Sequence, residues 1–192
     1  ISASGSDIWV DGVDVADYGT RVSDGGGGGT GVLVVPNVFG VPKNLRLSNS
    51  RFYPDSDAPI NIGWLMEASQ FSWAWGNYVL GALSGIGYAH ELKNNARFNL
   101  LWGLATEDSN VAIAYGQQGE DGADFNLCFG SVSSATDKGV LVGQGDGNLF
   151  VGILHNDTAS AGNTTVRSVD FAAGSDRNAA FAVAHHGTAG TS

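Results

Sequence analysis

The chain has 192 residues, enough for one domain with a sizeable core, and 43% of them are hydrophobic, which excludes a disordered chain. The formal net charge is −10 with only nine lysines and arginines, so we expect neither nucleic-acid binding nor attraction to an anionic membrane surface. Charged residues make up only 15% and glycines number 29, which indicates many turns and few long exposed helices. No apolar stretch is long enough for membrane insertion.

The segment 1–31 is mostly small and polar, and we expect it to form an N-terminal extension. The pair Asp11-Gly12 inside it predicts a hairpin turn between two short strands. Five consecutive glycines at Gly25–Gly29 predict a flexible hinge, since such a run cannot hold regular structure. We therefore divide the chain into an extension at 1–31 and a repetitive all-β domain at 32–192. Because the chain begins with Ile rather than Met, we expect it to be processed or a fragment.

From about residue 60 onward a four-residue pattern recurs, in which a large apolar residue, any residue, a large apolar or aromatic residue and a small residue follow one another. The small residue returns at a nearly constant interval of about 13–14 residues, which is the mark of an internal repeat. The copies are Ile60–Gly63, Trp73–Gly76, Ile86–Ala89, Leu100–Gly103, Ile113–Gly116, Leu127–Gly130 and Val140–Gly143. Turn-forming residues separate the copies, so each unit is a short strand plus a loop that buries its apolar side chains by stacking on neighbouring units.

This spacing predicts an all-β fold, for which two architectures remain open. One is a parallel β-solenoid or β-roll of 13–14-residue units, with one unit per coil. The other is an antiparallel β-sandwich or jelly roll with one strand per unit. The glycine content and the uniform period favour the solenoid. A helix over Ala89–Leu101 is a further alternative, because part of this segment has helical propensity.

Large and small side chains alternate within each copy, so they lie on opposite faces of the strand. We expect the large residues Ile113, Tyr115, Leu127 and Phe129 to point inward. The small residues on the other face would let another sheet or chain approach closely. The single cysteine, Cys128, forms no internal disulfide and is expected to be a small, buried apolar residue.

Two family resemblances appear along the chain. The segment Ser109–Gly116 resembles the head repeat of YadA-type trimeric adhesins, with weaker matches at Asn126–Gly130 and Gly139–Gly143. A second similarity, to phage tailspikes, rests on Val15–Gly19, the glycine-rich sequence after it, and Val32–Pro36. Both resemblances imply a trimeric attachment protein, and the first implies a trimeric β-roll.

The sequence contains no recognisable catalytic or metal-binding motif. No serine-hydrolase elbow is present, and the adjacent His185 and His186 would point to opposite faces of a strand. The segment Gly143–Leu149 resembles one turn of a calcium-binding nonapeptide repeat, but it stands alone, which favours an ordinary turn. We therefore expect no catalytic residues, no metal and no cofactor.

Paired carboxylates could still cleave a glycosidic bond if the fold brought them together in a groove. The candidates are Glu67, Glu91, Glu107, Asp108, Glu120 and Asp124, with Glu107 and Glu120 the first pair to test. Most of these acids lie in predicted turns, so we expect them to be solvated. For the same reason Asp121, Asp124 and Asp137 are expected to be exposed.

Five large aromatic residues are candidates for ligand binding: Trp64, Trp73, Trp75, Trp102 and Tyr115. Exposed rings would be platforms on which sugars stack. Their placement within the repeat favours a core role instead, because the large positions of each copy are expected to point inward.

From these observations we expect a non-catalytic structural or attachment protein at the surface of a virion or cell, such as a tailspike, tail fibre, head fibre or capsid-decoration component. The expected partners are other copies of the chain, as a homotrimer, or a larger assembly, together with a surface glycan. Two alternatives remain open. A glycan-degrading β-helix enzyme would carry paired acids in a groove, and a stand-alone carbohydrate-binding module would carry exposed, coplanar aromatic rings.

Overall fold

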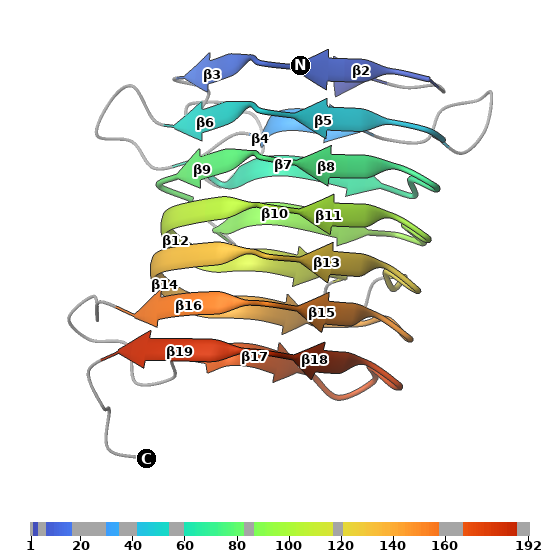
Figure 1. Cartoon of the computed structure of the whole chain (residues 1–192). Helices are drawn as coiled ribbons and strands as arrows, with labels where there is room; N and C mark the ends of the chain where they lie inside the picture. The colour runs from blue at the N-terminus through green and yellow to red at the C-terminus, as the bar shows by residue number, and fades with distance from the viewer. Residues whose placement is uncertain are drawn as a thin grey trace.

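The computed structural model describes residues 2–3, 7–16, 30–34, 42–53, 60–82, 87–116, 121–157 and 167–187. Within these ranges every regular element is a β-strand, and no helix long and apolar enough to cross a membrane occurs in them. The pairings among these strands are parallel. The strands stack as the coils of a β-solenoid (Figure 1), which confirms the predicted fold class.

Most strands are short, because each coil turns a corner after a few residues. In chain order they are β1 (Ser2–Ala3), β2 (Trp9–Asp11), β3 (Asp14–Ala16), β4 (Thr30–Val34), β5 (Arg46–Ser48), β6 (Arg51–Tyr53), β7 (Ile62–Glu67), β8 (Trp73–Trp75), β9 (Tyr78–Leu80), β10 (Tyr88–Lys93), β11 (Leu100–Trp102), β12 (Ala105–Tyr115), β13 (Leu127–Phe129), β14 (Val132–Val142), β15 (Leu149–Val151), β16 (Leu154–Asp157), β17 (Arg167–Phe171), β18 (Ala179–Phe181) and β19 (Ala184–Gly187). Strands β10 and β11 lie where a helix was the alternative.

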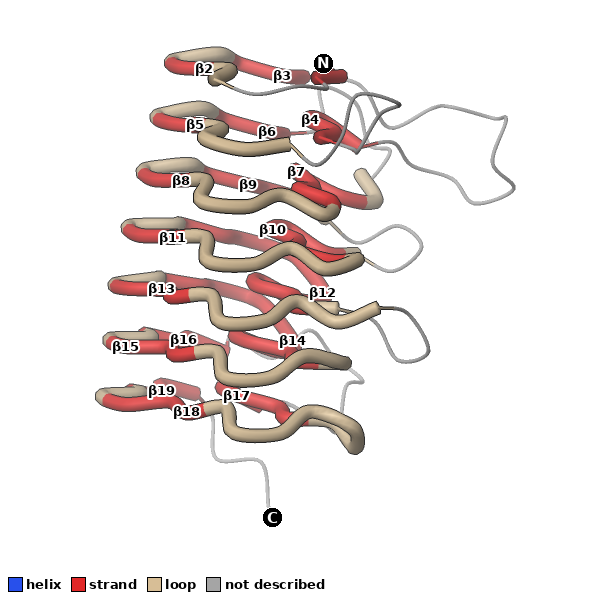
Figure 2. Tube along the Cα trace, turned by 90° about the vertical axis from the view of Figure 1, so that its right-hand side faces the viewer, coloured by secondary structure: helices blue, strands red, loops and turns tan. Residues whose placement is uncertain are grey.

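The solenoid has three faces, which Figure 2 shows from the side. One face is a seven-stranded sheet in the order β18-β15-β13-β11-β8-β5-β2, which we call the front sheet. The other two faces belong to a single 12-stranded sheet. They are continuous because the long strand β12 pairs with β9 near its start and with β10 near its end.

One coil takes up two of the 13–14-residue units. Trp73, Leu100 and Leu127 occupy the same position in successive coils of the front sheet. The unit that starts at Ile113 lies on the 12-stranded sheet, although in sequence it falls between Leu100 and Leu127. It pairs in register with the unit that starts at Val140. The expectation of one unit per coil is therefore corrected, because a three-sided coil needs more chain than one strand and loop provide.

The small residue that ends each unit on the front sheet is a corner of the coil. Gly76, Gly103 and Gly130 have φ values of 61°, 60° and 61°, in the left-handed region that glycine adopts without steric cost. The pair Asp11-Gly12 is also a corner and not the predicted hairpin, since β2 pairs with β5 whereas β3 pairs with β6. The division of the chain at residue 31 stays a prediction, and Gly25–Gly29 lie outside the described residues.

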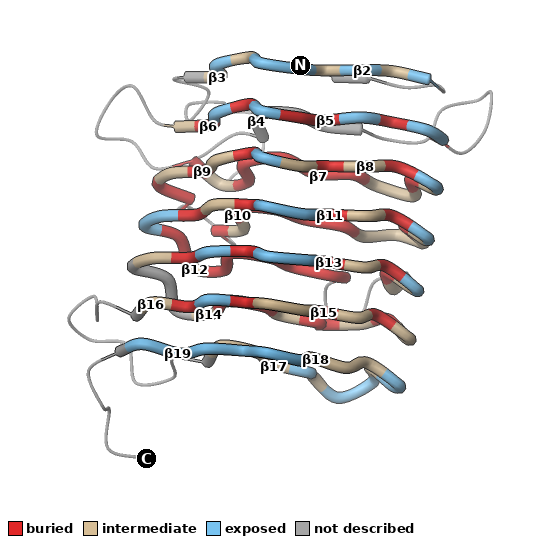
Figure 3. Tube along the Cα trace, viewed as in Figure 1, coloured by how far each residue is buried: buried red, intermediate tan, exposed pale blue. Residues whose placement is uncertain are grey.

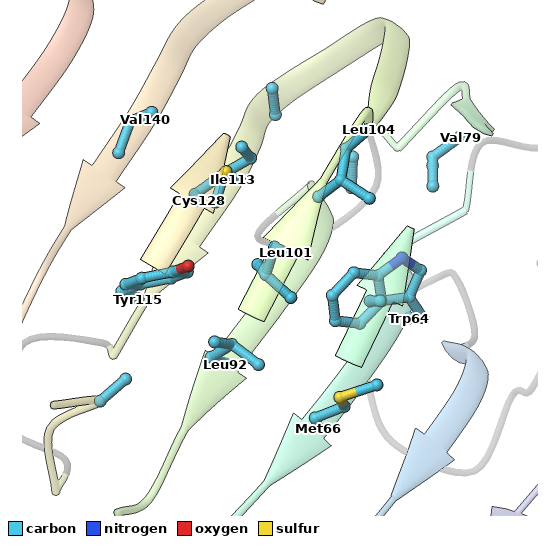
Figure 4. Close-up of a cluster of buried hydrophobic side chains, with 14 of the residues drawn as sticks. Trp64, Met66, Val79, Leu92, Leu101, Leu104, Ile113, Tyr115, Cys128 and Val140 are labelled. Carbon is cyan, nitrogen blue, oxygen red and sulfur yellow. The ribbon is translucent and has the colours of Figure 1, made fainter. Parts of the chain in front are cut away.

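Side chains from all three faces fill the interior. Figure 4 labels Trp64, Met66, Val79, Leu92, Leu101, Leu104, Ile113, Tyr115, Cys128 and Val140. The predicted inward orientation of Ile113 and Tyr115 is confirmed, and both are fully buried. Cys128 is buried as predicted, and burial raises the pKa of its thiol to about 12, so the thiol stays protonated and unreactive at neutral pH.

A column of polar side chains lines one corner inside the solenoid. Its members are Ser72, Asn99, Asn126, Asn148 and Asn178, which we call the asparagine ladder. The backbone N–H of Asn99 donates to Oδ1 of Asn126 at 3.0 Å, and that of Asn126 donates to Oδ1 of Asn148 at 2.9 Å. Asn126 Nδ2 also donates to the Ala96 carbonyl at 3.0 Å. The ladder pairs buried amides from one coil to the next and so fixes the corner.

Candidate ligand-binding face

The outer surface of the front sheet carries large side chains that were expected inside. Phe129 is 39% exposed and Leu127 is half-buried, whereas Cys128 between them is fully buried. The same holds one coil earlier, where Leu101 is buried and Trp102 is exposed. The prediction that Leu127 and Phe129 point inward is therefore wrong. Figure 3 shows that buried and exposed residues alternate along each coil of this sheet.

The corners explain this orientation. Strand β11 lies between two residues in the left-handed region, Phe98 with φ 57° and Gly103 with φ 60°. The residue after each of them, Asn99 and Leu104, points inward and is buried. Because side chains alternate along a strand, an inward Asn99 places Leu101 inside and sends Leu100 and Trp102 outward.

Parallel pairing in register places the same position of each coil directly beside the next, so the outward side chains form rows along the solenoid axis. The first row contains the residue at the corner before each strand. The second and third rows contain the first and last residues of the strand. We call the following set the aromatic face: Phe71, Phe98 and Phe125; Trp73, Leu100 and Leu127; Trp75, Trp102 and Phe129.

Neighbouring rings stack along the phenylalanine row and between Trp75 and Trp102. Phe98 lies 5.4 Å from Phe71 and 5.7 Å from Phe125 between ring centroids, with interplanar angles of 12° and 11°. Trp75 and Trp102 lie 4.9 Å apart with an angle of 4°. These separations are close to the spacing of about 4.8 Å between neighbouring strands, so the rings repeat with the coils.

The stacked rings remain in contact with solvent. Phe71, Phe98 and Phe125 are about half exposed, at 50%, 49% and 49%, and Trp102 is 37% exposed. Trp73, Leu100 and Leu127 in the middle row are half-buried. The result is a contiguous apolar surface with an aromatic row on each side, in contrast to the scattered apolar residues of an ordinary surface.

The five aromatic residues singled out from the sequence fall into two groups. Trp73 and Trp75 are half-buried and Trp102 is exposed, and all three lie on the aromatic face. Trp64 and Tyr115 are fully buried in the core, away from any surface that a ligand could reach. A role in ligand binding stays a prediction for the first three residues only.

Sequence reasoning missed the phenylalanine row. Phe71, Phe98 and Phe125 each precede a member of the asparagine ladder, namely Ser72, Asn99 and Asn126, and these members are 27 residues apart. The residue that follows the ladder member is Trp in the first of these coils and Leu in the other two. This longer repeat matches one coil, whereas the four-residue pattern matches strands on two different faces. A search at the longer period would have identified both the coil and the row.

The acidic candidates lie on several strands, with Glu67 on β7, Glu91 on β10, and Glu107 and Asp108 on β12. Glu91 is fully buried, contrary to the expectation that these acids are solvated. Glu107 accepts a hydrogen bond from the Tyr78 hydroxyl at 2.9 Å, and burial together with this bond raises the pKa of Tyr78 to about 12. Asp121 is exposed as expected, but Asp124 is half-buried and pairs with Arg97 at 3.1 Å. Glu120 and the side chain of Asp137 lie outside the description, so the Glu107–Glu120 pair stays untested.

No metal site is apparent in the described ranges, where no three His, Cys, Asp or Glu side chains form a suitable group. His185 Nδ1 lies 2.9 Å from Ser168 Oγ, whereas His186 Nδ1 lies 3.1 Å from Asn156 Oδ1, so the two rings contact different neighbours. Asp146 accepts a backbone hydrogen bond from Asp176, which lowers the pKa of its carboxyl.

Comparison with known proteins identifies the fold. No protein-family model and no curated protein sequence matches the chain. The structure is similar to that of an endo-xylogalacturonan hydrolase from Aspergillus tubingensis, with a TM-score of 0.68 and 12% sequence identity. The match covers 97% of this chain and 60% of that chain. At this level of identity the similarity establishes a shared β-helix fold.

The expectation of a non-catalytic protein is corrected by this similarity, because a hydrolase is built on the same fold. That expectation rested on the lack of local catalytic motifs. In a solenoid, however, residues far apart in sequence lie side by side, as Trp75 and Trp102 do. An active site assembled from successive coils would leave no local motif in the sequence.

Proposed function

We propose that this chain is a glycan-binding β-helix protein whose aromatic face binds an extended polysaccharide. The observation that carries the proposal is the pair of in-register aromatic rows on the front sheet, Phe71-Phe98-Phe125 and Trp75-Trp102-Phe129, which are exposed except for the half-buried Trp75. Such a surface is apolar and repeats along one axis. A polysaccharide matches these properties, because its sugar rings present apolar C–H faces at regular intervals along an extended chain.

Two further observations support a glycan ligand. Contiguous exposed aromatic surface is uncommon on a soluble domain and marks interaction sites. The structural neighbour is named for a polysaccharide, xylogalacturonan, so a related fold already serves glycan chemistry. Attachment of a virion or cell to a glycan-bearing surface is the biological role that we infer from such binding.

Binding of the purified chain to a panel of insoluble polysaccharides tests the proposal. We expect the double substitution Trp75→Ala, Trp102→Ala to weaken binding at least about tenfold, since loss of two stacking rings removes more than about 1.4 kcal/mol. Phe171→Ala is the matched control, because Phe171 is 41% exposed but lies on β17, away from the aromatic face. Equal binding by all three proteins would reject the aromatic face as the glycan site.

Hydrolysis is tested on the same panel by measuring new reducing ends. Glu107→Gln is the first variant to compare, because Glu107 is an exposed carboxylate held by the Tyr78 hydroxyl. Turnover that Glu107→Gln abolishes would extend the proposed function from binding to cleavage and would place the reaction on the 12-stranded sheet.

A second candidate function is favoured by the same apolar surface, namely an interface between copies of the chain, as in the homotrimer that the family resemblances imply. A specific interface would bury at least about 1,000 Å² in total. Analytical ultracentrifugation separates the two candidates. A trimer that dissociates on substitution of Trp75 and Trp102 would assign the face to assembly, whereas an unchanged mass with lost glycan binding would assign it to the glycan.

A further inference from the structure

Toward the N-terminal end of the solenoid, the middle row of the aromatic face includes a charged side chain. There it continues from Trp73 to Arg46 on β5 and Trp9 on β2, which pair in register. The guanidinium carbon of Arg46 lies 5.0 Å from the ring centroid of Trp73 and 5.9 Å from that of Trp9. Both distances lie within the range of cation–π attraction, so two indoles hold the cation in place.

Arg46 differs from the other arginines whose side chains are described, each of which pairs with an acid. These pairs are Arg51–Asp14 at 2.8 Å, Arg97–Asp124 at 3.1 Å and Arg177–Asp146 at 3.2 Å. No carboxylate among the described residues pairs with Arg46, although Arg46 is exposed. Its N–H donors are therefore available to an anionic ligand.

A recess of about 240 Å³ opens beside this side chain, lined by Asp7, Ile8, Trp9, Asn44 and Arg46. Trp9 Nε1 donates to Ser48 Oγ at 3.1 Å, which fixes the indole, and Asn44 Nδ2 donates to Asp7 Oδ1 at 3.2 Å. The recess thus offers an aromatic wall, a carboxylate that can accept hydrogen bonds from hydroxyl groups, and one cation.

We propose that this recess is a subsite for an acidic sugar, a uronate unit of the bound polysaccharide. Arg46 binds the sugar carboxylate, for which the planar guanidinium has the matching geometry, and Asp7 accepts hydrogen bonds from the sugar hydroxyls. This inference rests on the proposed function, because the recess continues the aromatic face and binds one unit of the same polymer.

The net negative charge of the chain bears on how an acidic sugar could be bound. With a formal net charge of −10, the protein repels an acidic polymer at long range. Preference for an acidic glycan therefore requires a local cation on the binding surface. Arg46 provides such a cation, in register with Trp73 at the end of the aromatic face.

The test compares polygalacturonate with its methyl ester, two polymers that differ in the charge of the same group. Binding is measured by affinity electrophoresis at fixed ionic strength. We expect the native chain to bind the acid form roughly tenfold more tightly, in line with a charge-assisted hydrogen bond. Arg46→Gln removes this preference and leaves binding of the ester unchanged. A sulfated neutral glycan, run in parallel, shows whether a sulfate ester serves in place of the carboxylate.

Two control variants match the test. Arg51→Gln changes the net charge by the same amount at an arginine outside the aromatic face, and it should leave the preference intact. Asp7→Asn replaces the carboxylate with a weaker amide acceptor, so it should weaken binding of the ester, whereas loss of the negative charge beside the recess should partly offset this loss for the acid form. Circular dichroism confirms that each variant is folded.

The outcomes separate the two proposals. If the native chain binds acid and ester equally and Arg46→Gln changes neither, the uronate subsite is wrong while the polysaccharide-binding face stands. If the native chain binds neither polymer nor any neutral polysaccharide, the proposed function fails and the subsite with it. If the sulfated glycan alone shows dependence on Arg46, the ligand is an anionic sugar but not a uronate, and the subsite as proposed is wrong.

Discussion

Strands β12 and β13 follow each other in the chain and carry the same alternating pattern, yet they orient it in opposite ways. On β12 the large residues Ile113 and Tyr115 are fully buried. On β13 the large residues Leu127 and Phe129 point outward, and the small Cys128 between them is buried. The same sequence pattern therefore builds the core on one sheet and a ligand-binding candidate on the other.

The comparison separates two kinds of information. Alternation of large and small residues indicates which side chains share a face of a strand. It does not indicate which face is inward. That choice is made at the corners, where a left-handed residue such as Phe98 and a buried polar residue such as Asn99 fix the phase of the following strand.

The largest expected effect is the difference in stability loss between a phenylalanine that points inward and one that points outward. Phe150 on β15 is fully buried, whereas Phe129 on the neighbouring strand β13 is 39% exposed. Phe150→Ala should lower the free energy of unfolding by about 3–5 kcal/mol, through lost burial and a cavity. Phe129→Ala should cost about 1 kcal/mol or less. Urea unfolding of the two variants measures both values. Similar losses would contradict the inward orientation of Phe150 and the outward orientation of Phe129.

An intermediate effect is expected at the asparagine ladder. Asn126→Ala would leave the Asn99 backbone N–H without its partner and would remove one of the two donors to the Ala96 carbonyl in the buried corner. We expect a loss of about 1–3 kcal/mol in the free energy of unfolding. Asn156→Ala, at a half-buried position on β16, is the control and should have a smaller effect. Equal losses would show that the ladder adds nothing to the corner.

A smaller effect is the pH dependence of stability that the buried His90 causes. Burial lowers the pKa of His90 to about 3, and a contact with the Ala105 backbone only partly opposes this shift. The unfolded chain, with a histidine pKa near about 6.5, therefore takes up the proton first as the pH falls. The free energy of unfolding is therefore unaffected by His90 above about pH 6.5 and falls progressively below it. The loss reaches about 1–2 kcal/mol at about pH 5.

Chemical denaturation at a series of pH values measures this slope. His90→Leu should flatten it, because leucine does not titrate. A slope that survives His90→Leu would place the responsible group elsewhere.

Much of the fold could be predicted from the sequence, because a regular unit that cannot bury its own apolar face must stack. The coil length could not be predicted from the four-residue pattern, since this pattern occurs on two faces of the same coil. The pattern Phe-Ser/Asn-Trp/Leu returns once per coil, and it carries that information in Phe71, Phe98 and Phe125.

The candidate site was predictable only in part. Trp73, Trp75 and Trp102 were singled out as aromatic residues, but their placement at the large positions of the repeat favoured an inward orientation. The neighbourhood of Arg46 was beyond sequence reasoning. Its partners Trp9 and Trp73 come from the coils on either side, and unequal loops between the coils hide the register.

The central claim is that the front sheet presents its aromatic residues to a polysaccharide, and the five tryptophans of the chain test it directly. Their indole N–H signals can be followed by NMR while oligosaccharide fragments of a bound polymer are added. We expect saturable shifts for Trp75 and Trp102 on the aromatic face and none for Trp64, which is fully buried. Binding that leaves the signals of Trp75 and Trp102 unmoved would contradict the claim.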